Sequence, residues 1–497
     1  MNRSAALADK SPNITAEGCA RAMHSPRLTQ AEQQRLKRFW IRKNGGSLKI
    51  VQIKLLSEQD PGTQMFAAVL RKDAACIVTI LANHDIGQWY RQVFRLIRTT
   101  SFAALILHCL QDRALLRQII DSFLSETVAY TKSNKLQRRI LAKLQRLAMI
   151  ESLNCEKLNA TFAKILSSLH GSTDNVIWIK GASLARSVYA HPEYRTSSDF
   201  DCVVRSAALQ PTIETLAHNL DYRSAVSPSF CNQIGCGPTA NITDFLLSPS
   251  SELLQPSPTS LAHPRGWPMI DLKLNPLGRG IAMVELERFF AEAPTIQWRS
   301  YRLRIPSTVD QLTIALINLA DKERFNNLRC LFDIHLLVNA LNETPHLWQD
   351  FLQSCKAEGV EIPCRFGLLL ANDYFGSAIP AKVLQELDCG AKSLWLTAAA
   401  FMIQPEFVWN SNSLVSLVLS SACTSDAHRR ISVLVKAILP TTEFLQKYYA
   451  SDRPIPTALC LIVHWLVLLL PGGIIRRTFG RHVWTCPPLA WNSKVER

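Results

Sequence analysis

The periodicity of the apolar residues changes abruptly at the segment GSTDN, residues 171–175, and this change constrains the fold more than any other feature of the chain. Before it, from about residue 64, apolar residues recur at spacings of three and four, which predicts helices. After it, short β-type runs alternate with helical stretches in the order VIWIK, ASLARSVY, DFDCVV and QPTIETLAHNL. Strand, helix, strand, helix is the order of an α/β unit.

Two more strands are expected, in PMIDLKLN at 268–275 and in YRLRIPS from Tyr301. The segment 223–268, between the helical stretch QPTIETLAHNL and the strand PMIDLKLN, is rich in Ser, Pro, Asn and Gly and is expected to be a long loop. Ser307 with Asp310 three residues on resembles a capping box, and helical periodicity follows to about Tyr449. We therefore predict an α+β protein in which a small mixed sheet is flanked by N-terminal and C-terminal helical regions.

The expected organisation has five parts. They are a flexible basic tail (1–45), a helical region (46–170), the mixed-sheet core (171–306), a helical domain (307–450), and an apolar helix with a basic tail (451–497).

Asp199 and Asp201 stand one residue apart at the start of the run DFDCVV. Alternate side chains of a strand share a face, so the two carboxylates point the same way while Phe200 and Cys202 enter the opposite layer. Two like charges this close favour protonation of one of them unless a cation lies between them. A divalent metal removes this conflict, and Mg²⁺ prefers a few carboxylates completed by water and phosphate oxygens. Asp271, a lone acid in an alternating strand, is expected as the third acid of a two-metal site.

Gly181 stands at the end of the expected strand VIWIK, directly before a helical stretch. A glycine there lets the backbone approach a phosphate, and the helix N-terminus supplies N–H donors. Lys180 and Arg195 are candidate charge partners for a triphosphate.

The stretch IKGASLARSVYAHPEYRTSSDFDCVVR, residues 179–205, resembles the bacterial uncharacterised nucleotidyltransferase family, within the superfamily that has the DNA polymerase β-like core. The superfamily pattern is a strand, Gly-Ser, a helix, then DxD and a later third Asp. Members of the family read Lys-Gly, a small-residue helix, Tyr, Pro and Arg before Ser-Asp-x-Asp. The stretch STVDQLTIALINLADKERFNNLRCLFDIHLLV, residues 307–338, is similar to the helical part of that family. The resemblance covers 178–340, roughly a third of the chain.

The resemblance implies a nucleotidyltransferase-type core that moves a nucleoside monophosphate from an NTP to a hydroxyl-bearing acceptor with the help of Mg²⁺ or Mn²⁺. Carried over residue by residue, Asp199, Asp201 and Asp271 would be the metal ligands and catalytic acids, with Asp271 nearest the acceptor. Gly181 would be the glycine of the phosphate loop.

The chain departs from the superfamily at Ala182, where a serine should follow the glycine. Ser183 is either a displaced replacement for that serine or an ordinary residue of the early helix. Lys180, Arg195 and Ser198 are the other residues expected to contact the nucleotide.

A second group of residues is expected further along the chain. Arg329 and Asp333 are spaced for an ion pair on a helix surface, or they line an acceptor pocket together with Lys273. His335 lies in an apolar helix and is expected to be a satisfied core or interface histidine. Tyr189 is expected to pack its helix against the sheet.

The net charge of +15 is consistent with an anionic partner. The basic residues are spread along the chain, and their densest run is RLKRFWIRK at 35–43. The 14 cysteines are scattered, so we expect reduced thiols, no disulfide-linked partner and a cytoplasmic protein. A metal site at Cys231, Cys236 and His263 is disfavoured by its spacing. The apolar segment 457–470 is shorter than a membrane span and suits a buried helix or a weak peripheral membrane contact.

Three classes of function stay open at this point. The first is an active nucleotidyltransferase, whose acceptor could be a small molecule, a protein side chain or an RNA end. The second is a catalytically inactive member of the same fold that binds a nucleotide or a partner. The third is an accessory protein associated with a membrane or a nucleic acid, for which the basic charge and the segment 457–470 are the evidence.

Overall fold

The computed structural model of the protein describes residues 60–388, apart from gaps at 84–85, 112–129, 172, 225–258, 278–283, 322, 324 and 326, together with a few single positions between 431 and 465. The tail 1–45, the run at 35–43, most of the long loop and the Cys231/Cys236 pair lie outside the described residues. So do most of the segments 389–450 and 451–497, including most of 457–470. Among the helices that are described, none has the length and apolar character needed to cross a membrane.

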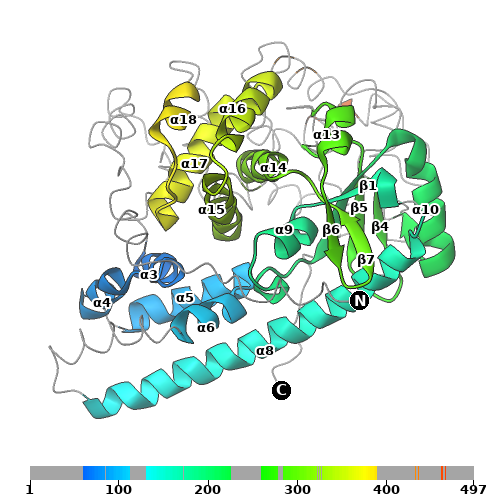
Figure 1. The fold of residues 1–497 in the computed structure, drawn as a ribbon. Helices are drawn as coiled ribbons and strands as arrows, with labels where there is room; N and C mark the ends of the chain where they lie inside the picture. The colour runs from blue at the N-terminus through cyan, green and yellow to red at the C-terminus, as the bar shows by residue number, and fades with distance from the viewer. Residues whose placement is uncertain are drawn as a thin grey trace, which may run out of the picture.

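Within the described residues, helices come first, the sheet follows, and further helices come last (Figure 1). The first helices are α3 (Pro61–Leu70), α4 (Ala74–Asn83), α5 (Ile86–Thr100), α6 (Ala103–Gln111) and α8 (Tyr130–Ser168). The core holds η2 (Thr173–Asn175), β1 (Val176–Ile179), α9 (Gly181–Ser187), η3 (Pro192–Tyr194), β2 (Asp199–Val204), α10 (Ser206–Leu220), β3 (Arg223–Ser224), β4 (Thr259–Ala262), β5 (Met269–Lys273), α13 (Leu286–Glu292), β6 (Thr295–Trp298) and β7 (Tyr301–Arg304). The last helices are α14 (Thr308–Asp321), α15 (Leu328–Asn342), α16 (Leu347–Glu358), α17 (Glu361–Phe375) and α18 (Ala381–Glu386).

The central sheet is mixed and has the order β1-β2-β5-β4-β3. Its neighbours are antiparallel except for β2 and β5, which run parallel. A separate antiparallel hairpin is formed by β6 and β7. The predicted α+β class, with a small mixed sheet beside helices, is confirmed.

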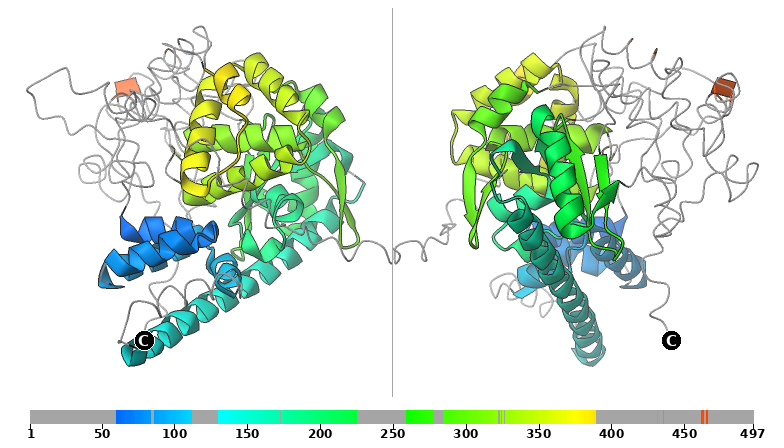
Figure 2. Two further views of the ribbon diagram at one scale, coloured as in Figure 1. Left: turned by 60° about the vertical axis from the view of Figure 1, so that its left-hand side comes forward. Right: turned by 90° about the vertical axis from the view of Figure 1, so that its right-hand side faces the viewer.

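The two faces of the sheet bury different side chains. Trp178, Phe200 and Ile270 lie on one face, in a core cluster with Phe162 of α8 and Leu216 of α10. The ring of Phe162 stacks on Phe200 at 4.8 Å between centroids. Figure 2 shows α8 running past this face and well beyond the sheet.

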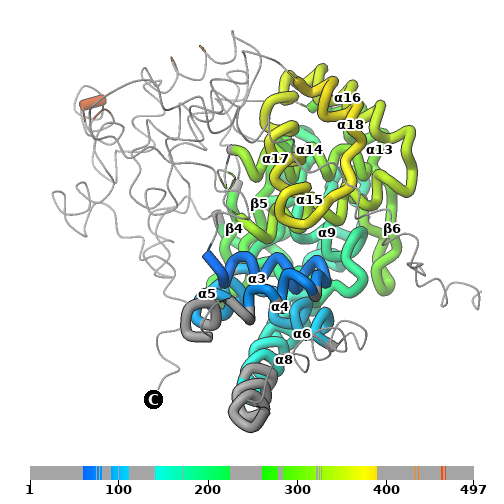
Figure 3. The backbone as a smooth tube through the Cα atoms, turned by 90° about the vertical axis from the view of Figure 1, so that its left-hand side faces the viewer, coloured from blue at the N-terminus to red at the C-terminus, as the bar shows by residue number. Residues whose placement is uncertain are grey.

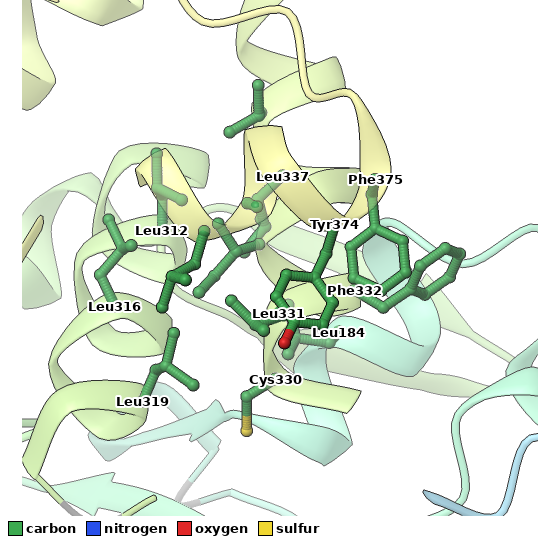
Figure 4. Close-up of a cluster of buried hydrophobic side chains, with 14 of the residues drawn as sticks. Leu184, Leu312, Leu316, Leu319, Cys330, Leu331, Phe332, Leu337, Tyr374 and Phe375 are labelled. Carbon is green, nitrogen blue, oxygen red and sulfur yellow. The ribbon is translucent and has the colours of Figure 1, made fainter. Parts of the chain in front are cut away.

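The opposite face turns toward the other helices. Ile177, Ile179 and Val203 join the large cluster that includes α3 to α6 and α14 to α17. Leu184 of α9 lies among the side chains of α14, α15 and α17 in this cluster (Figure 4). Asp201 shares its face with Val203, because side chains two apart on a strand point the same way. Asp201 therefore lies on the face of the sheet that packs against the helices.

Ser307 caps α14 as predicted, although the reciprocal contact of Asp310 is with the Ser307 hydroxyl instead of its backbone N–H. The Ser307 hydroxyl accepts from the backbone N–H of Asp310 at 3.1 Å and donates to its carboxylate at 2.8 Å. The helical stretch expected to run on from there is interrupted, however, between α14 and α15. Asn327 causes the restart, because its side-chain oxygen caps α15 by accepting from the N–H groups of Arg329 and Cys330.

The helix expected in QPTIETLAHNL begins earlier than predicted. Helix α10 starts at Ser206, so Pro211 lies inside the helix instead of in its first turn. Helix α13 and strand β6, which lie within 286–298, were not predicted.

His335 of α15 is a half-buried histidine with polar partners, as expected. Its Nδ1 lies 2.9 Å from the hydroxyl of Ser377, and burial lowers the pKa of the imidazole to about 4. The unfolded chain binds a proton below about pH 6.5, and the folded chain does so only near pH 4. The free energy of unfolding must therefore fall as the pH drops from about 6.5 to 4, by up to ~3 kcal/mol.

We expect His335→Gln to reduce this loss, because glutamine does not titrate. Urea unfolding of both proteins at pH 7 and pH 4.5 measures the difference. An equal acid loss in the wild-type protein and the variant would contradict a neutral half-buried histidine.

Candidate functional site

The three predicted carboxylates come from two neighbouring strands. Asp199 opens β2, and Asp201 follows on the same strand. Asp201 stands directly opposite Asp271 in the parallel register of β2 and β5, and opposite Ile179 in the antiparallel register of β1. Asp201 is 6% exposed. The fold thus brings together acids that are far apart in the sequence.

Two lysines contact the central acid. The Lys273 ammonium lies 2.5 Å from Oδ1 of Asp201, and the Lys180 ammonium lies 3.1 Å from the same oxygen. Lys273 lies on the face of β5 that carries Asp271, two residues away. Both lysines were expected near bound ligands, and the structure places them against the acid itself.

The two outer acids accept from serines. Asp271 accepts from the hydroxyl of Ser260 on β4 at 2.6 Å. Asp199 accepts from Ser197 at 3.3 Å and from Ser198 at 3.4 Å. Ser198 therefore lies at the acidic cluster. Ser198 was predicted from the sequence to contact the nucleotide.

Burial and charge shift the pKa values in this cluster. Burial raises the pKa of Asp271, and the negative charge of Asp201 raises it further. Burial by itself would lower the pKa of Lys180, but the charge of Asp201 outweighs that effect and the pKa is raised. The lysines thus offset part of the charge of the acids. These lysines reduce the cost of burying carboxylates that carry no metal.

Lys180 and Gly181 form the turn between β1 and α9. Lys180 has φ 53° and ψ −127°, a backbone conformation that residues other than glycine rarely adopt. A Cβ on Gly181 would meet Oγ of Ser197 at 2.7 Å and its Cβ at 2.9 Å. Glycine is therefore required because the loop before β2 lies directly on the backbone of this turn.

Arg195 is held by α15. Its Nε and Nη2 donate to the two carboxylate oxygens of Asp333 at 2.8 and 2.9 Å, and its Nη1 donates to the carbonyl of Thr196 at 2.9 Å. Tyr189 also donates its hydroxyl to Asp333, at 2.7 Å. Arg195 and Asp333 are both buried. We refer to Tyr189, Arg195 and Asp333 as the buried clamp.

The buried clamp changes three interpretations. Arg195 was expected to face a triphosphate, but its guanidinium is engaged with Asp333 and the Thr196 carbonyl. A surface ion pair between Arg329 and Asp333 was one of two alternatives, but Asp333 binds Arg195 and Arg329 donates to the carbonyl of Thr196 at 3.3 Å. Tyr189 joins α15 as well, instead of packing its helix only against the sheet. Both arginines therefore fasten the loop that leads to Asp199.

A small cavity of about 50 Å³ lies beside this clamp. It is bounded by α9, α14 and α15, and its lining includes Lys180, Ser183, Gln311, Asn318 and Asp333. Ser183 is fully buried and donates its hydroxyl to the Lys180 carbonyl at 3.0 Å. This bond is that of an early-helix residue. Arg329 and Lys273 are not among the residues that line the cavity.

The donor set can be compared with what a divalent metal needs. Three carboxylates supply the hard oxygen ligands that Mg²⁺ and Mn²⁺ prefer, so the chemistry of the cluster fits. Within the described residues, no three acidic, histidine or cysteine side chains stand close enough together to hold an ion as they are. A metal would therefore have to replace the lysine contacts of Asp201.

The family model described as Uncharacterised nucleotidyltransferase matches residues 90–376, which is more than half of the chain. The chain belongs to this family of nucleotidyltransferases, which the sequence had suggested. The match extends beyond the resemblance at 178–340 and takes in α5, α6, α8, α16 and α17. The comparisons found no match among curated proteins and none among solved structures.

Several residues of the site were not found from the sequence. Ser197 and Ser260 contact the acids, and Gln311 and Asn318 line the cavity. Ser197 stands in the run TSSDFD and could have been noticed by its position two residues before Asp199. Ser260 lies in the segment 223–268, which was predicted to be a loop, but the structure places it in β4. Only the pairing of β4 with β5 brings it to Asp271, so it carries no local signal.

Proposed function

We propose that the protein transfers a nucleoside monophosphate from an NTP to a hydroxyl group of an acceptor and releases pyrophosphate, in a reaction that needs Mg²⁺ or Mn²⁺. The observation that carries the proposal is the register of β2 and β5, which sets Asp201 opposite Asp271 with Asp199 two residues earlier on the same strand. Membership of a nucleotidyltransferase family supports it.

Each residue has a proposed role. Asp199, Asp201 and Asp271 would hold the metal, which when bound would neutralise phosphate charge and polarise the reacting phosphate. Asp271 is the acid proposed to lie nearest the acceptor hydroxyl. Once a metal takes over Asp201, the ammonium groups of Lys180 and Lys273 would be available for phosphate oxygens. Gly181 keeps the turn close to the loop that carries Ser198.

Label transfer tests this proposal. We expect the purified protein, incubated with a cell extract and Mg²⁺, to pass label from an α-³²P NTP mixture to an acceptor, and to pass none from γ-³²P NTP. Excess EDTA should abolish the transfer, and added Mn²⁺ should restore it. Transfer of the γ label, or α-label transfer that survives EDTA, would contradict the proposal.

A second candidate is a protein that binds a nucleotide without transferring it. The observation that favours it is the pair of lysines on Asp201, which balance the acid in the absence of any metal. Binding of a fluorescent nucleotide analogue, combined with no label transfer in extracts from several growth conditions, would support this candidate over the first.

A further inference from the structure

Three exposed arginines form a row along α5. Arg91, Arg95 and Arg98 follow the spacing of i, i+4 and i+7, so they share one side of the helix. All three side chains are exposed. At a rise of about 1.5 Å per residue, successive cations in the row are separated along the axis by roughly 6 and 4.5 Å.

A second row with the same spacing lies on α8. It consists of Arg139, Lys143 and Arg146, of which the two arginines are exposed and the lysine is partly buried. The Lys143 ammonium lies 4.3 Å from the centre of the Phe94 ring, on α5 directly before Arg95. This contact brings the middle of the α8 row to α5, and Figure 3 shows α5 and α8 on the same side of the molecule. We call the six side chains the double basic row.

The helices that carry the double basic row contain few opposite charges. Helix α5 has no acidic residue, and α8 has none from Tyr130 to Ile150. The first acid of α8, Glu151, turns to α6 and accepts from the backbone N–H of Ala104 at 3.1 Å. A solvated helix surface usually mixes both signs of charge, so a double row of one sign marks a surface for an anionic partner.

We propose that the double basic row binds the phosphate backbone of a nucleic-acid strand. Regularly spaced cations on two neighbouring helices suit a chain of evenly spaced phosphates. Contacts of this kind do not read bases, so binding is independent of sequence and similar for RNA and DNA strands. The proposal does not rest on the proposed transfer reaction, because it concerns other helices and needs neither NTP nor metal.

A lipid surface is the competing partner, because Met149, Ile150 and Leu153 are exposed on the same side of α8 beyond Arg146. Binding in a membrane interface requires a long apolar helix face that can enter the lipid. The apolar side of α5 is not available for that, since Phe94 and Ile97 are buried in the protein core. Helix α5 therefore offers positive charge but no accessible apolar face, which favours a nucleic acid over a lipid surface as the partner.

Fluorescence anisotropy with labelled single strands of RNA and DNA of the same sequence, about 20 nucleotides long, tests the proposal across a salt series. The variant R91Q/R95Q/R98Q removes one row while keeping good helix formers. Its matched control is R265Q/R302Q/K382Q, which removes the same charge from exposed positions on other elements. Circular dichroism verifies that both variants fold.

We expect both strands to bind the wild-type protein and the control alike. The α5 variant should bind about tenfold or more weakly, with a salt slope reduced by about 2, which corresponds to three lost phosphate contacts on a single strand. The variant D199N should bind as the wild-type protein does, so that failure of this proposal and failure of the transfer reaction can be told apart.

Three results would overturn the proposal. The first is equal binding by the α5 variant and the wild-type protein. The second is an equal loss in the control, which would mean a general effect of net charge. The third is binding to vesicles with phosphatidylserine, weakened by the α5 changes, without any binding of RNA or DNA.

Discussion

Changing Asp199 and Asp201 together to asparagine will abolish nucleotidyl transfer, with a loss of about a thousandfold or more, or ~4 kcal/mol of transition-state stabilisation. Asparagine keeps the shape of each side chain but removes two of the three negative charges proposed to hold the metal. Transfer of α-phosphate label to the acceptor measures the effect. Transfer that survives the double change would refute the assignment of the site.

The single variants separate catalysis from folding. Asp199 accepts from two serines, so Asp199→Asn should lose transfer with little change in the free energy of unfolding. Asp201→Asn leaves the ammonium groups of Lys180 and Lys273 without their shared carboxylate, so it should lose both transfer and stability. The control D174N/D350N, at two exposed acids, should change neither.

Breaking the buried clamp will produce the largest loss of stability. Asp333→Asn removes the partner charge of a buried arginine that makes two hydrogen bonds to it, and we expect the free energy of unfolding to fall by about 3–5 kcal/mol. The matched control is Glu287→Gln, because Glu287 pairs with Arg205 at 2.8 Å but is 79% exposed. The surface pair should contribute at most ~1 kcal/mol.

Chemical denaturation of both variants gives the comparison. Replacing the clamp as a whole, in Y189F/R195M/D333L, should recover much of the lost stability, because the triple change leaves no buried charge alone. A similar small loss in D333N and E287Q would show that the clamp is not a buried ion pair in solution.

The fold class and the strand positions of the three acids could be predicted from the sequence because their signals are local. A period of two puts Asp199 and Asp201 on one face, and an alternating strand around a single acid marks Asp271. The class follows from the change of periodicity at 171–175. Neither conclusion needs knowledge of which distant residues meet.

The partners of the basic residues could not be predicted for the opposite reason. Asp333 lies 138 residues after Arg195, and nothing near Arg195 distinguishes an arginine that binds phosphate from one that binds a carboxylate. Lys180 posed the same problem, since its partner Asp201 is chosen by the pairing of β1 with β2. The predicted helix boundaries near Pro211 and Asn327 were wrong because tertiary packing and a helix cap override the local pattern.

The parallel pairing of β2 and β5 has a consequence for the order in which the protein is made. During synthesis β2 leaves the ribosome well before β5, and a parallel pair can close only after the whole connection between the strands is available. Until then Asp201 has neither Asp271 beside it nor Lys273 as a counter-ion. The acidic cluster is therefore completed late, so an incomplete chain that stops before Met269 carries the DxD pair without a working site.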